Sequence, residues 1–205
     1  MTETPEPLVH PVRIEDLRPT QMTVGFREVA LKRSAWRTHI ERDGADYLGR
    51  HLIPVVIGPK GRFHLIDHHH LARALFEEGV KHVLVHVLAD LERLSPEDFS
   101  TFLDNRNWLH PYDAKGERHP YKDVPKHIGK LYDDPYRSLA GAVRRAGGFA
   151  KTDIPFAEFL WASFFRRHVS TKRLNDTFNE AVGKAFTLAR SPKADHLPGW
   201  SGAEG

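Results

Sequence analysis

The chain has 205 residues, of which 40% are hydrophobic and 28% are charged, and it contains no cysteine. This is the composition of an ordinary globular protein, and the absence of thiols excludes disulfides, zinc–thiolate sites, iron–sulfur clusters and cysteine nucleophiles. The formal net charge of +3 is compatible with a nucleotide or nucleic-acid partner, but it is too small to indicate one by itself.

The two ends of the chain, residues 1–9 and 191–205, are predicted to be flexible tails. The N-terminal residues are acidic and rich in proline, and they lack the charged-then-apolar pattern of a signal sequence. No apolar run approaches the roughly 20 residues that a bilayer-spanning helix requires. We therefore expect a cytoplasmic protein without a membrane partner.

The first third of the chain alternates short strand and helix patterns. Residues 12–14 predict a short edge strand, residues 16–20 a turn, and residues 24–42 a helix with only loose apolar periodicity. The β-branched run 53–57 and the run 63–66 flank a Gly-Pro-Lys-Gly turn, which predicts a β-hairpin.

A helix is expected directly after this hairpin, from about His68 to Glu78. Asp67 precedes it as a candidate N-cap, and Gly79 follows its last turn as a candidate C-cap. A third strand is predicted over residues 80–88, and Ser95 is expected to cap the next helix. Later helices are predicted over residues 135–146, 155–168 and 171–190, the last with Ser170 as its cap, after a long segment without periodicity at 105–135.

Chemically reactive side chains concentrate in the run Asp67-His68-His69-His70, where a strand ends and a helix begins. The first turn of a helix presents unpaired backbone N–H groups and the positive end of the helix dipole, so phosphate oxygens bind well there. Flanking imidazoles add charge-assisted donors. Histidine is not a favoured helix starter and is repelled by the dipole when protonated, so three in a row indicate a function.

Other interpretations of the same run remain open. Asp67 is equally suited to be a helix cap, a general base, or a ligand for Mg²⁺ beside a bound nucleotide. His68 and His70 would converge on zinc, with Asp67 or His64 as a third ligand, only if the backbone were extended. On a helix their side chains diverge, and we therefore expect no metal bound by the protein alone.

The segment LIDHHHLARAL resembles the phosphate-binding motif of the ParB/sulfiredoxin superfamily, and it is most similar to the ParB-like nuclease family. The upstream residues fit as well, with a short first strand, Gln21 after a turn, and a Pro-Val-Val-Ile strand. The resemblance covers about residues 10–90. It implies an α+β fold: a small mixed-sheet domain of the ParB/sulfiredoxin type over residues 10–95, with a C-terminal helical domain or extension over residues 96–190.

The resemblance also implies a nuclease (a hydrolase) or a nucleotide-dependent phosphoryl-transfer enzyme, with a nucleotide or nucleic acid as its partner. By position, Asp67 and His69 match catalytic residues. Phosphate-binding positions are matched by His68, His69, His70 and Arg73, and secondary candidates are Gln21 and Arg33.

This sequence departs from the family pattern at two positions of the motif. His68 replaces the usual glycine and Leu71 replaces an arginine. The absence of cysteine excludes sulfiredoxin chemistry. The alternatives to an enzyme are a non-catalytic nucleotide- or DNA-binding module of the ParB type, and a partner-binding protein that keeps only the fold.

Overall fold

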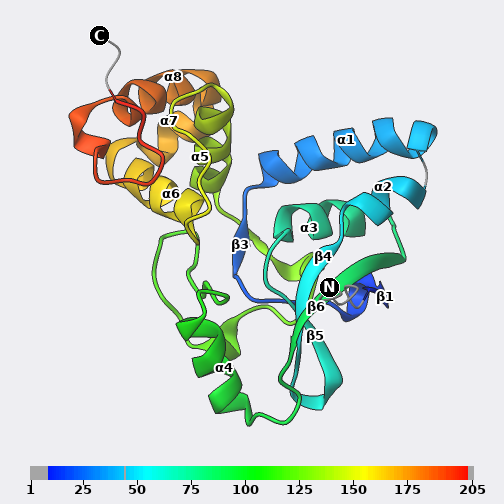
Figure 1. Ribbon diagram of the computed structural model, residues 1–205. Helices are drawn as coiled ribbons and strands as arrows, with labels where there is room; N and C mark the ends of the chain where they lie inside the picture. Colours follow the sequence, from blue (N-terminus) through cyan, green and yellow to red (C-terminus); the bar gives the residue numbers. More distant parts are fainter. Residues whose placement is uncertain (1–8, 44, 203–205) are drawn as a thin grey trace, which may run out of the picture. The chain divides into compact units, whose positions relative to one another are not determined.

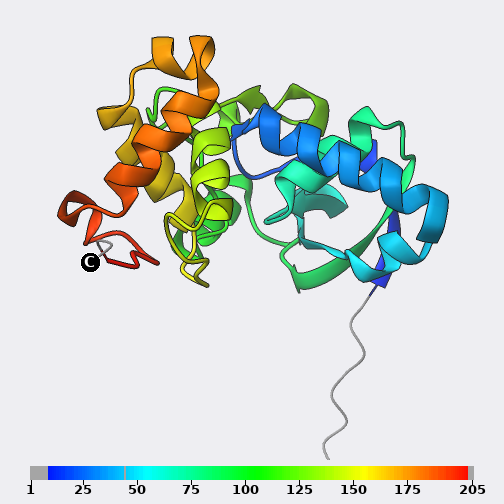
Figure 2. The ribbon, with the colours of Figure 1, turned by 90° about the horizontal axis from the view of Figure 1, so that it is seen from above.

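The computed structural model describes residues 9–43 and 45–202, and these residues divide into two compact units (Figures 1 and 2). Unit 1 comprises the segments Met1–Thr23, Val29–Asp113 and Glu117–Tyr132. Unit 2 comprises the segments Val24–Glu28, Ala114–Gly116 and Asp133–Gly205. The predicted N-terminal tail lies outside the described residues except for Val9, which begins a strand.

Unit 1 is built on a mixed five-stranded sheet in the order β1-β6-β4-β5-β2. These strands are β1 (Val9–Arg13), β2 (Arg18–Pro19), β4 (Ile53–Gly58), β5 (Arg62–Leu65) and β6 (His82–Asp90). The hairpin of β4 and β5 is antiparallel, whereas β4 pairs with β6, and β2 with β5, in parallel. The predicted hairpin and edge strand are confirmed. The segment predicted as a turn instead forms η1 (Ile14–Asp16) and β2.

In the chain, the helices of unit 1 lie between and after the strands of its sheet. They are α1 (Phe26–Asp43, whose first three residues belong to unit 2), α2 (Ala45–Arg50), α3 (His69–Glu77) and α4 (Pro96–Asn105). Leu71 and Leu75 on α3 are buried. Gly79 has a φ of 74°, and its amide donates to Phe76 O, so the predicted glycine stop of α3 is confirmed. Within the described residues, no helix has the length and apolar character that crossing a membrane requires.

Helix α4 begins where the sequence predicts, because Ser95 Oγ accepts the Asp98 amide. The predicted domain boundary at residues 95/96 does not fit this unit, however. Phe99 and Leu103 of α4 are buried in one apolar cluster with Met22 and Val56. Since that burial would be lost without the sheet, residues 96–113 and 117–132 belong with the strands.

Unit 2 is helical and has its own aromatic core. Its helices are α5 (Pro135–Arg145), α6 (Ala157–His168), α7 (Thr171–Asp176) and α8 (Phe178–Ala189). Trp161 of α6 is fully buried and stacks on Phe149, with their ring centroids 4.1 Å apart. A second, two-stranded sheet pairs β3 (Thr23–Val24) with β7 (Tyr132–Asp133), and the first residue of each of these strands belongs to unit 1. The α+β class with a mixed sheet and a helical C-terminal part is confirmed.

Two predictions for the C-terminal region are wrong. The helix predicted over residues 171–190 is interrupted at Thr177, whose φ of −144° and ψ of 69° are not helical. The predicted tail is ordered over residues 191–202, because Ala194 and Leu197 are buried in the core of unit 2. Pro198 O also accepts a hydrogen bond from Trp161 Nε1 at 2.8 Å. Residues 203–205 lie outside the described residues.

Candidate functional site

The start of α3 has an unusual backbone conformation. His68 precedes the helix with φ 64° and ψ 25°, in the left-handed region, and its side chain makes no capping hydrogen bond. Asp67 is not the N-cap that the sequence predicts. Its Oδ1 accepts the His68 amide at 2.6 Å, one residue before the helix begins, so it is too early in the chain to reach the amides of the first turn.

His69 faces the interior of unit 1. Its exposed fraction is 4%, and its Nε2 accepts the backbone amide of Thr20 at 3.2 Å. Thr20 Oγ1 in turn donates to Leu65 O at 2.8 Å, at the end of β5. Because a ring nitrogen that accepts a hydrogen bond carries no proton, the ring has its proton on Nδ1 when it is neutral. His69 thus joins the start of α3 to the residue that follows β2.

His68 lies on the surface with positive groups around it. Displacement of water from its ring lowers the pKa of His68, and the charges of Lys32 on α1 and His51 before β4 lower it further. The carboxylate of Asp67 opposes this shift, and its effect is larger than that of either Lys32 or His51. We call Lys32, His51 and His68 the α3 basic cluster. The charges of Lys32 and His51 favour an anion beside His68, whereas the carboxylate of Asp67 opposes one.

The remaining phosphate-binding candidates have other contacts. His70 is half-buried. Arg73 donates through Nη1 to Leu131 O at 2.9 Å and through Nε to Glu77 at 2.6 Å. This guanidinium therefore holds the segment before β7 against α3. The three imidazoles do not converge, since His69 points inward while His68 lies beside Lys32.

The two secondary candidates also hold structure together. Arg33 on α1 pairs with Glu78 at 2.6 Å and with Glu77 at 2.9 Å, so that α1 lies along α3 (Figure 1). Gln21 is buried, and its Nε2 donates to Thr23 O at 2.9 Å. His51 is the functional candidate that the sequence interpretation missed, because its distance of 17 positions from His68 in the chain hid their proximity.

Metal-ligand geometry occurs at a different place from the one considered in the sequence. Over residues 9–43 and 45–202, the only group of histidine and carboxylate atoms close enough to hold an ion is Asp113, Glu117 and His119, within 4.8 Å of one another. His119 Nε2 lies 3.1 Å from Asp113 Oδ2, and Asp113 Oδ1 accepts the Glu117 amide. These hydrogen bonds close the turn between Asp113 and His119, so the turn explains why the three side chains lie close together.

Comparison with known proteins gives a family and a similar structure. Residues 10–167 match the model of a family described as putative ParB-like nuclease. The crystal structure of protein Atu1540 from Agrobacterium tumefaciens is 50% identical, with a TM-score of 0.90, over 97% of this chain and 100% of that chain. No curated protein sequence matches the chain significantly.

A second solved structure is much less similar. It is the C-terminally truncated chromosome-partitioning protein ParB from Caulobacter crescentus, complexed with CTP-gamma-S. Its identity is 14% and its TM-score is 0.31, over 91% of this chain and 94% of that chain. A similarity of this size supports no conclusion about the ligand of the present chain.

Replacement of His68 by glycine is expected to stabilise the fold. A left-handed conformation is disfavoured for residues with a β-carbon but not for glycine, so His68→Gly should raise the free energy of unfolding by about 1 kcal/mol. Urea denaturation measures the change. A lower stability would show that contacts of the imidazole outweigh the backbone strain.

Replacement of His69 by alanine is expected to have the opposite effect. His69→Ala removes a buried ring and leaves the Thr20 amide without its acceptor, so the free energy of unfolding should fall by about 2 to 4 kcal/mol. The matched control is His82→Ala, at an exposed position on β6, which should change stability by less than about 0.5 kcal/mol. Equal effects of the two substitutions would contradict the structural role of His69.

Proposed function

The chain belongs to the putative ParB-like nuclease family, and from this premise we propose that it binds a phosphate group of a nucleotide or nucleic acid at the start of α3. The observation that supports the proposal is the α3 basic cluster, in which Lys32, His51 and His68 gather beside the first turn of the helix. Two features of the chain, the helix start and the positive charges of Lys32 and His51, favour an anion at one place, and the negative charge of Asp67 opposes it.

The chemistry of such a contact follows from the groups that are present. Phosphate oxygens are acceptors, and the ammonium of Lys32 together with the N–H groups of His51 and His68 are donors. A bound anion would raise the lowered pKa of His68, because negative charge stabilises the imidazolium. Binding and protonation of His68 are therefore coupled.

A nuclease or phosphoryl-transfer activity is the second candidate function, favoured by the position of Asp67. This carboxylate is exposed and lies next to His68, where a phosphate would sit. An exposed carboxylate is a suitable general base, and it is also a suitable oxygen ligand for a magnesium ion that arrives with a nucleotide. His69 would reach a substrate only after releasing the Thr20 amide, so in this arrangement it acts as a positioning residue.

Substitutions in the α3 basic cluster are expected to weaken phosphate binding. Lys32→Ala and His68→Ala should each raise the Kd for a single-stranded oligonucleotide or a nucleoside triphosphate by about tenfold, since each removes one donor to the anion. Fluorescence anisotropy measures binding of the oligonucleotide, and a thermal-shift titration measures binding of the nucleotide. Lys81→Ala, which removes an exposed lysine before β6, is the charge-matched control and should leave both values unchanged.

The pH dependence gives this experiment a second measurement. The pKa of His68 lies below its ordinary value, so the imidazolium forms only as the pH falls below about 6.5. Affinity for the oligonucleotide, whose phosphodiesters keep their charge, should therefore rise as the pH falls from about 8 to about 5.5. This rise should be much smaller in His68→Ala. Equal pH profiles for the two proteins would contradict a contact between His68 and phosphate.

The variant Asp67→Asn separates an enzyme from a binding module. We expect it to bind the oligonucleotide at least as well as the unmodified protein, because a negative charge is removed from the site. Any Mg²⁺-dependent cleavage of the oligonucleotide should fall by about 100-fold, the contribution of a general base. Cleavage that is unchanged in Asp67→Asn would exclude Asp67 from catalysis, and absence of cleavage in the unmodified protein would favour the module.

A further inference from the structure

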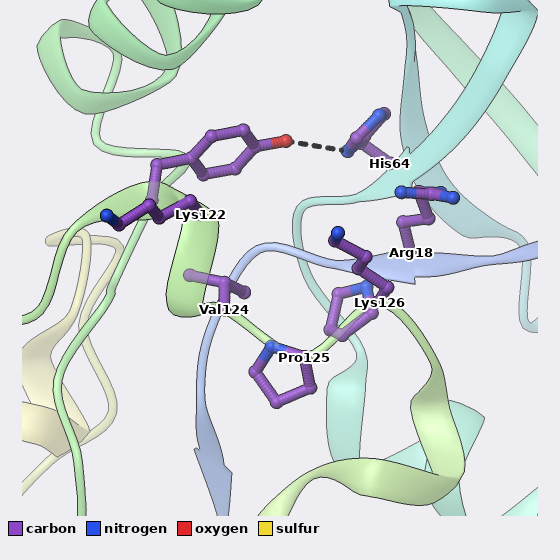
Figure 3. A pocket seen from close by; sticks show the side chains of 8 residues that line it. Arg18, His64, Lys122, Val124, Pro125 and Lys126 are labelled. Carbon is purple, nitrogen blue, oxygen red and sulfur yellow. Dashed lines mark hydrogen bonds between the residues drawn. The ribbon is translucent and has the colours of Figure 1, made fainter.

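A pocket of about 70 Å³ lies in unit 1 at the edge of the sheet formed by β2. Arg18 of β2 stands opposite His64 of β5 in the parallel register, and the segment after η3 (Tyr121–Asp123) closes the other side (Figure 3). We call this the β2 pocket. It is lined by Arg18, Pro19, His64, Tyr121, Lys122, Val124, Pro125 and Lys126. The α3 basic cluster contributes no residue to it.

The charged side chains that line the β2 pocket, Arg18, Lys122 and Lys126, are all positive. Arg18 and Lys126 extend their charged ends toward the space beside His64, whereas the amine of Lys122 points away from it (Figure 3). Arg18 is partly buried, and its pKa is lowered by that burial and then by the charge of Arg62. Arg62 and Lys126 are exposed, so the cost of burial falls on Arg18, and a bound anion would offset it.

Among the described residues, Arg18 has no carboxylate partner, in contrast to two other arginines that are shielded from solvent. Arg73 pairs with Glu77 in unit 1, and Arg166 pairs with Asp134 in unit 2. In the part of the chain that the structure describes, neither Arg18 nor Lys126 forms a salt bridge. A guanidinium held in a concave site without a carboxylate partner is arranged to receive an external anion.

The neutral wall of the pocket adds hydrogen-bonding groups without adding charge. Tyr121 Oη lies 3.3 Å from His64 Nδ1, and the imidazole packs edge-on against Phe99 with centroids 4.7 Å apart. Burial, together with the charges of Arg18 and Arg62, lowers the pKa of His64 to about 4. Burial also raises the pKa of Tyr121 to about 12. Both groups are therefore uncharged near neutral pH. When His64 Nδ1 carries the ring proton and donates it to Tyr121 Oη, the hydroxyl proton of Tyr121 is available for a ligand.

The size of the pocket limits what it can enclose. A water molecule needs about 10–15 Å³ of such space, so the volume suits several waters or one small oxyanion. A tetrahedral oxyanion has enough acceptors for a guanidinium, an ammonium and a neutral O–H or N–H donor at once. A planar monocarboxylate has fewer oxygens and a smaller charge to place among them.

From this geometry we propose that the β2 pocket is a second anion site, which binds a phosphate group, either free or carried by a small phosphate ester, between Arg18 and Lys126. The site is separate from the proposed function at the start of α3, and it stands on its own cavity and its own side chains. The pocket walls come from three stretches of chain that are far apart in the sequence, so no local sequence motif indicates this site.

The test uses the full chain with inorganic phosphate as the probe. To remove the contribution of the other site, the titration is made in a Lys32→Ala/His68→Ala background and followed by thermal shift and by NMR chemical shifts of backbone amides. Phosphate should raise the Tm and shift amides of β2, β5 and residues 121–126. Lys126→Met should weaken this response by about tenfold, since it removes one cation and leaves an exposed position otherwise intact.

Controls distinguish a built site from a general effect of charge. Lys122→Met removes an equal charge from the same segment, but its amine points away from the space, so phosphate affinity should change by less than about threefold. Arg18→Met should abolish binding. If that variant does not fold by circular dichroism, Tyr121→Phe replaces it and should weaken binding by about threefold or more.

Titrations with different anions distinguish the possible ligands of the β2 pocket. Tighter binding of glycerol phosphate than of inorganic phosphate would identify an ester as the ligand, and the reverse would identify the free ion. Acetate that binds as well as phosphate would overturn the proposal, as would equal losses in Lys122→Met and Lys126→Met. A lack of any phosphate response in the Lys32→Ala/His68→Ala background would also overturn it, while leaving the proposal for the α3 basic cluster untouched.

Discussion

The hydrogen bond between the Thr20 amide and His69 Nε2 joins the two parts of unit 1 on which both proposed sites depend. On one side it fixes the first residue of α3, and on the other it fixes the residue that directly follows β2. Thr20 Oγ1 adds a bond to Leu65 O, so the same short segment is held to the end of β5 as well. Because His69 lies in the interior, His68 remains at the surface, where it forms the α3 basic cluster with Lys32 and His51.

The sequence predicted those elements whose signals are local. The β-branched run and the Gly58–Gly61 turn indicated the hairpin, Ser95 indicated the start of α4, and Gly79 indicated the end of α3. The predicted boundary after residue 95 was wrong because Phe99 is buried against residues that are distant in sequence. Periodicity likewise continued through Thr177, although the backbone breaks there.

The candidate site shows the same division between local and distant information. A motif of four consecutive residues located the helix start, but it could not separate the buried histidine from the exposed one. That separation depends on Thr20, which lies 49 positions away. The left-handed backbone of His68 could not be predicted from the sequence either, because the residue is a histidine and not a glycine, which would have indicated that conformation. The β2 pocket assembles residues 18, 64 and 126, and pattern reasoning has no access to such a combination.

Arg73 attaches the segment before β7 to helix α3. A single guanidinium reaches Glu77 on its own helix and the carbonyl oxygen of Leu131 across the gap, which requires a planar group with several donors. Lysine would keep the charge at this position but would offer only one nitrogen to satisfy both acceptors. The position is thus selective for side-chain shape, and a substitution that appears conservative would loosen the loop that leads back to Lys126.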